Sequence, residues 1–108
     1  SAHWCPPCWS WHTGGVMEDL YHDFGPDGTN EFMVYMLDSD PASSISILQG
    51  GGSSMGNWIT GTPYPIIGPN GQGSSVASNY VYSGVPTLFL HCGPGTAPEI
   101  QRNEKWVF

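Results

Sequence analysis

Two cysteines separated by two prolines stand near the start of the chain, and this CPPC motif at residues 5–8 constrains the fold more than any other feature. A helical pattern follows it, because Val16, Leu20 and Phe24 recur every four residues with polar residues between them. Proline is tolerated in the first turn of a helix, since the N–H that it lacks has no partner there. The sequence therefore predicts a helix over residues 9–24 that has the CPPC motif at its start.

Short apolar runs alternate with loops along the rest of the chain. Residues 32–37 are six consecutive apolar residues bounded by turn signals, a pattern typical of a strand buried on both faces. Residues 87–92 predict a second strand, and residues 63–67 a weak edge strand that tolerates proline. Short helices are predicted over residues 43–48 and 74–82. This alternation of helices and strands predicts the α/β class.

Length and charge set limits on domain count and partners. The 108 residues, 39% of them apolar, suffice for one domain over residues 1–108 but not for two. Only Arg102 and Lys105 are basic and the net charge is −7, so we expect no nucleic-acid partner and no docking on anionic lipid. No apolar run reaches the roughly 20 residues of a membrane span, so membrane insertion is not expected. The sparsely charged composition suits a secreted protein.

The position of the two cysteines at a helix start predicts thiol chemistry. Free N–H groups and a partial positive charge at that end of a helix stabilise a thiolate, which is the nucleophile in thiol–disulfide exchange. Cys5 is expected to be the exposed attacking residue, and Cys8 is expected to resolve the mixed disulfide. Pro6 and Pro7 stiffen the loop between them. A static structural disulfide is the alternative.

A metal site is a second alternative for the same region. His3, Cys5, Cys8 and His12 lie close in sequence and include two sulfur and two nitrogen donors. A C-x-x-C motif at a helix start is more typical of redox chemistry, so neither a metal nor an organic cofactor is expected. The third cysteine, Cys92, is expected to be a buried apolar side chain rather than a free thiol for an intermolecular bridge.

Two segments resemble the thioredoxin-like superfamily. Residues 2–9, AHWCPPCW, look like the active-site segment of bacterial secreted or periplasmic thiol-disulfide domains of the TlpA/ResA type. Residues 84–90, GVPTLFL, are similar to the family's loop that carries a cis-proline and precedes a central strand. The resemblance covers roughly residues 2–94 and keeps the family's chain order. It implies a three-layer sandwich with a mixed central sheet and helices on both faces.

The resemblance also implies a function. It predicts a periplasmic or extracellular thiol-disulfide oxidoreductase that acts on protein thiols and disulfides, with Cys5 and Cys8 as the catalytic pair and no cofactor. The peptide bond before Pro86 would be cis. Four residues would form the substrate-binding surface: Trp4, Val85, Pro86 and Thr87.

The chain departs from the family before the motif, where only Ser1-Ala2-His3 stand in place of an apolar strand. Residues 104–108, EKWVF, read like that strand. Our hypothesis is that this tail fills the position, from its own chain or from a second copy, which would make a homo-oligomer through Trp106, Val107 and Phe108. The alternative is an ordinary last strand at the sheet edge. A second functional hypothesis follows: a secreted structural or interaction module that assembles by strand donation and has Cys5–Cys8 as a structural disulfide.

Overall fold

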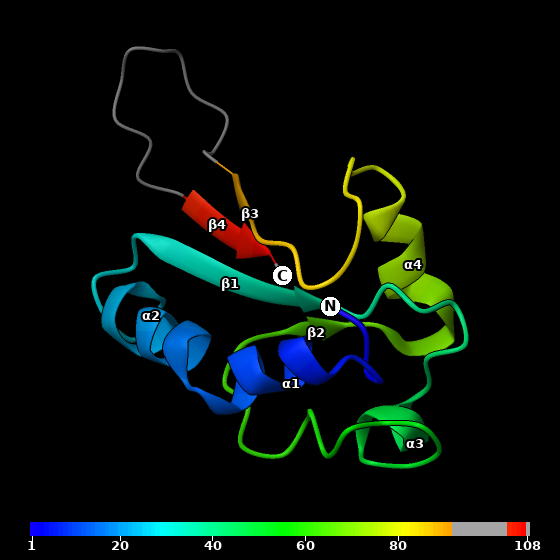
Figure 1. The fold of residues 1–108 in the computed structure, drawn as a ribbon. Coiled ribbons are helices and arrows are strands. Elements are labelled where there is room, and N and C mark those ends of the chain that lie inside the picture. Colours follow the sequence, from blue (N-terminus) through cyan, green and yellow to red (C-terminus); the bar gives the residue numbers. More distant parts are fainter. Residues whose placement is uncertain (92–103, 108) are drawn as a thin grey trace.

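A computed structural model of the protein describes residues 1–91 and 104–107, and these ranges form a mixed α/β fold (Figure 1). The helices are α1 (Pro6–Thr13), α2 (Val16–Phe24), α3 (Ile45–Leu48) and α4 (Gln72–Ala77), with a 3-10 turn η1 (Pro69–Gly71) before α4. The strands are β1 (Phe32–Leu37), β2 (Ile66–Ile67), β3 (Phe89–His91) and β4 (Glu104–Val107). The predicted α/β class is confirmed. Within the described ranges, none of the helices is both long and apolar enough to cross a bilayer.

The last strand of the chain lies inside the sheet. The strand order is β2-β1-β4-β3, with β1 parallel to both of its neighbours and β3 antiparallel to β4. Val107 of β4 is opposite Tyr35 on one side and Phe89 on the other. The C-terminal segment therefore pairs on both edges within its own chain and is not an edge strand (Figure 1).

The first residues of the chain continue the line of β4 along β1. The Ser39 N–H donates to the Ser1 carbonyl oxygen at 2.9 Å. In a parallel ladder this hydrogen bond places Ser1 opposite Asp38. Because Val107 is opposite Tyr35, three register positions separate Val107 from Ser1 along the same side of β1.

The core lies where β1 meets the N-terminal helices. Val34 and Met36, on one face of β1, are fully buried, and α2 packs against this strand. Met33 and Tyr35 on the other face are half-buried, so the predicted burial of both faces is complete on one face only. Trp58 is the largest fully buried side chain. Its ring meets that of Trp9 on α1 edge to face, with 4.9 Å between the ring centroids. These contacts fix α1, and with it the CPPC motif, against the sheet.

Two predicted helices have different bounds in the structure. The helix expected over residues 9–24 is divided into α1 and α2, because Gly15 has a φ of +79°, which a continuous helix does not allow. The helix expected over residues 74–82 is α4, which begins after Gly71 at a φ of +77° and ends at Ala77. The strand expected over residues 87–92 is limited to β3, and Cys92 lies outside the described residues.

Candidate thiol-disulfide site

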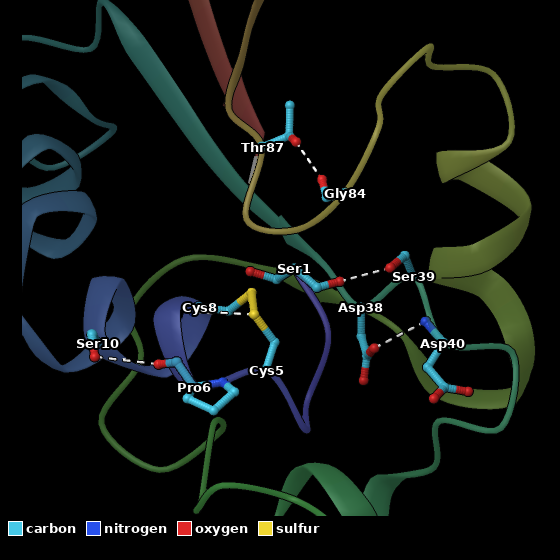
Figure 2. Close-up of a disulfide and its surroundings, with 10 residues drawn as sticks. All are labelled: Ser1, Cys5, Pro6, Cys8, Ser10, Asp38, Ser39, Asp40, Gly84 and Thr87. Atoms are coloured by element: carbon cyan, nitrogen blue, oxygen red, sulfur yellow. Dashed lines mark hydrogen bonds between the residues drawn. A yellow bond between two sulfur atoms is a disulfide. The ribbon is translucent and has the colours of Figure 1, made fainter.

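The two cysteines of the motif form a disulfide at the start of α1 (Figure 2). Cys5 is the N-cap residue, with extended backbone, and Pro6 opens the helix. The Cys8 N–H donates to Cys5 Sγ at 3.2 Å. One of the N–H groups that a helix start leaves without a backbone partner therefore points at the Cys5 sulfur. The position predicted for the motif is confirmed.

Both cysteines are buried, which differs from the exposed Cys5 expected from the sequence. Cys5 is 2% exposed and Cys8 is fully buried. Both belong to the main apolar cluster, and Val85 from the loop before β3 packs against that cluster. Figure 2 shows this loop, with Gly84 and Thr87, beside the disulfide. The expectation was wrong because the residues of this cluster come from distant parts of the sequence and enclose the cysteines only in the folded chain.

The segment predicted to bind substrate turns tightly before β3. The Val85–Pro86 peptide bond is cis, as the resemblance implies. The Thr87 hydroxyl donates to the Gly84 carbonyl oxygen and closes the turn (Figure 2). Val85, Pro86 and Thr87 are half-buried, so parts of each are accessible. The structure thus brings this loop and the disulfide together.

The residues just before the disulfide are tied to the turn that follows β1. Trp4 is 48% exposed, and its Nε1–H donates to Asp40 Oδ2 at 2.9 Å. The backbone N–H of Ala42, together with Trp4, lowers the pKa of the Asp40 carboxyl. His3 is buried, and its Nδ1 lies 2.8 Å from Oδ2 of the fully buried Asp38. This pair was not predicted, because the acidic residues after β1 resemble an ordinary turn in the sequence.

His12, the second histidine of the predicted metal alternative, belongs to a separate network of hydrogen bonds. His12 Nδ1 lies 3.2 Å from the Tyr64 hydroxyl, and Nε2 lies 3.4 Å from Thr62 Oγ1. The ring is also stacked at a tilt against Trp9 and Trp58. Burial lowers the pKa of His12 below its usual 6.5. This network borders a polar cavity of about 270 Å³.

The four side chains of the metal alternative are not brought together. Cys5 and Cys8 are bonded to each other, while His3 faces Asp38 and His12 faces Tyr64. Over residues 1–91, no three or more His, Cys, Asp or Glu side chains are grouped so as to hold a metal ion. The role predicted for Cys92 concerns a residue outside the described ranges.

Comparison with known proteins finds no similar family model, no similar curated protein and no similar solved structure. What the site can do is therefore argued from its own residues and their geometry.

Proposed function

We propose that this chain is a thiol-disulfide oxidoreductase of the periplasm or extracellular space, built on a thioredoxin-like three-layer sandwich with helices on both faces of its mixed sheet. One observation carries the proposal: Cys5 caps α1, and its sulfur accepts the Cys8 N–H at 3.2 Å. In the reduced protein the same N–H and the positive end of the helix stabilise a Cys5 thiolate. That stabilisation favours Cys5 as the nucleophile.

The exchange takes place in two displacements. The Cys5 thiolate attacks one sulfur of a substrate disulfide, a mixed disulfide forms, and the other substrate sulfur leaves as a thiolate. The Cys8 thiolate then attacks Cys5 Sγ, which closes the Cys5–Cys8 bond and releases the second substrate thiolate. The substrate gains two electrons and the protein loses two. The same steps run in reverse when the protein oxidises a substrate dithiol.

Protein substrates would bind near the disulfide, in contact with Trp4 and with the loop that precedes β3. Trp4 is 48% exposed and directly precedes Cys5. Val85 packs against the cluster that contains both cysteines, while part of its loop, with Pro86 and Thr87, remains accessible. An extended substrate segment can lie between Trp4 and this loop. The loop directly precedes β3, and β3 pairs with β4, which is parallel to β1. This arrangement of the loop and the strands supports the thioredoxin-like scaffold.

The burial of the disulfide favours a second candidate function. Structural cysteines are buried and inert, and Cys5 is only 2% exposed. In this case Cys5–Cys8 is a structural disulfide in an interaction module, and assembly by strand donation would require β4 to leave its place between β1 and β3 and pair in a second copy. A buried disulfide in an exchange protein requires Cys5 to become accessible before it reacts.

The reduction potential of the Cys5–Cys8 pair tests the proposal. We expect a value between about −270 and −120 mV on equilibration in glutathione buffers, the range of known exchange proteins. A Cys8→Ser variant should trap a mixed disulfide on Cys5, and a Cys5→Ser variant, the matched control, should trap none. A potential below about −300 mV with no trapping by Cys8→Ser would reject the oxidoreductase and favour the structural module.

A further inference from the structure

Three side chains from distant parts of the chain contact one another in series: Asp38, His3 and Ser53. The Asp38 carboxylate lies 2.8 Å from His3 Nδ1, and His3 Nε2 lies 3.5 Å from the Ser53 hydroxyl oxygen. Asp38 follows β1, while Ser53 belongs to the glycine-rich loop after α3. The order of groups is carboxylate, imidazole and hydroxyl, as in an activated serine nucleophile.

Hydrogen bonds fix the imidazole in the tautomer that such a nucleophile needs. Asp38 accepts the proton on His3 Nδ1, and Nε2 is the ring nitrogen that faces the Ser53 hydroxyl. The Asp40 N–H donates to the other Asp38 oxygen at 3.1 Å, which holds the carboxylate in place. Asp40 Oδ2 also lies 4.0 Å from His3 Nε2, but it already accepts the Trp4 indole N–H at 2.9 Å.

The loop that carries Ser53 is anchored to His3 and offers hydrogen-bond donors. The Met55 N–H donates to the His3 carbonyl oxygen at 2.9 Å, which fixes the loop beside the imidazole. Gly52 has a φ of +56° and is exposed, as is Ser53. Within the described part of the chain, the N–H groups of Gly52 and Ser53 have no hydrogen-bond acceptor. Successive free N–H groups at such a turn can stabilise an oxyanion.

We infer that Ser53, His3 and Asp38 form a second catalytic site that hydrolyses carboxylic esters bearing an apolar group. Ser53 and His3 are its catalytic residues, and Asp38 is a positioning residue. The apolar preference comes from Trp4, which is 48% exposed and whose indole is hydrogen-bonded to Asp40 Oδ2, an atom 4.0 Å from His3 Nε2. This inference does not depend on the function proposed for the disulfide.

The reaction balances without a cofactor. Ser53 Oγ bonds to the ester carbonyl carbon while its proton passes to His3 Nε2, and the Gly52 and Ser53 N–H groups stabilise the oxyanion. The C–O bond to the alcohol then breaks, and the alcohol leaves with the proton from His3. Water repeats the sequence on the acyl-serine and releases the acid. The net change is ester plus water to acid plus alcohol.

The test measures hydrolysis of 4-nitrophenyl butyrate by the oxidised full chain with Cys92 alkylated, so that no thiol contributes. Ser53→Ala should lower the rate about 100-fold, the scale of a lost nucleophile–base pair. Ser75→Ala, a change at another exposed serine, should leave the rate unchanged. Because Ser53 is exposed, its alanine variant should fold, and circular dichroism checks this. Wild-type rates in Ser53→Ala would overturn the inference.

Two further readouts separate catalysis from adventitious surface reactivity. A fluorophosphonate should label Ser53, with the serine oxygen bonding to phosphorus and fluoride leaving, and mass spectrometry locates the label. Asp38→Asn should lower kcat and leave KM unchanged, because Asp38 touches His3 and not the ester. Labelling at any other residue would contradict the site. A disulfide found to be inert would leave all these results unaffected.

Discussion

Reduction of the Cys5–Cys8 disulfide should lower the free energy of unfolding by only about 2 kcal/mol, the value that the loop-closure relation gives for so short a ring. The bridged residues are three positions apart, so the bond removes little freedom from the unfolded chain. The Cys8 N–H that points at Cys5 Sγ stays available to a thiolate and offsets part of the loss. Both sulfurs also remain in the apolar cluster, where thiols are tolerated.

The assay is urea unfolding followed by circular dichroism at 222 nm, with and without a reductant, on protein with Cys92 alkylated. The reduced form should remain folded without urea, and its denaturant slope should equal that of the oxidised form. A Cys5→Ser, Cys8→Ser double variant is the control, because its curve should not respond to the reductant. A loss above about 4 kcal/mol, or a reduced protein that is unfolded in water, would refute the loop-closure reasoning and identify the bond as a structural requirement.

Three further predictions concern the elements around the disulfide. Trp58→Ala should cost about 3–5 kcal/mol in urea unfolding, because Trp58 is the largest fully buried side chain. Burial lowers the pKa of His12 in the folded state, so the unfolded chain binds the proton more tightly; stability should fall as pH drops below about 6.5, and a His12→Gln variant should flatten that dependence in a series of urea midpoints. Gly73→Ala should destabilise by about 1–3 kcal/mol by thermal unfolding, because its Cβ would overlap the carbonyl oxygens of Asp38 and Ile67, whereas Gly61→Ala meets no atom within 4 Å and pays only for its positive φ.

Patterns of neighbouring residues predicted the helices and strands whose formation depends mainly on those residues. The six apolar residues of β1 form a strand in which Val34 and Met36 are fully buried. Such a run of apolar side chains is removed from water only when other helices and strands pack against it. The CPPC motif opened α1 because Pro6 suits a first helical position. The division of the long helical pattern came from Gly15, whose left-handed backbone outweighed the apolar periodicity on either side.

The rest depended on contacts between distant residues. His3 meets Asp38 across 35 positions and Ser53 across 50, and no spacing pattern in a single sequence indicates such pairs. The burial of Cys5 arises in the same way, since Val85 reaches the cluster from the other end of the chain. The contacts among Asp38, His3 and Ser53 and the burial of the disulfide were therefore visible only in three dimensions.

Because β4 and Ser1 lie along the same side of β1, the two ends of the chain can be joined there. Val107 and Ser1 are three register positions apart, about 10 Å at the rise of a strand, so Phe108 and one added residue suffice to link them. Joining the chain there would extend β4 as far as Ser1, and the turn over residues 2–5, which the Cys5 N–H closes on the Ala2 carbonyl oxygen, would then lead into the CPPC motif. A circular permutant that is joined at this point and opened beside the exposed Gly52 should keep the same sheet order, because exposed loop tips tolerate new termini. A permutant that folds in this way would show that the arrangement of the helices and strands does not depend on the position of the chain termini.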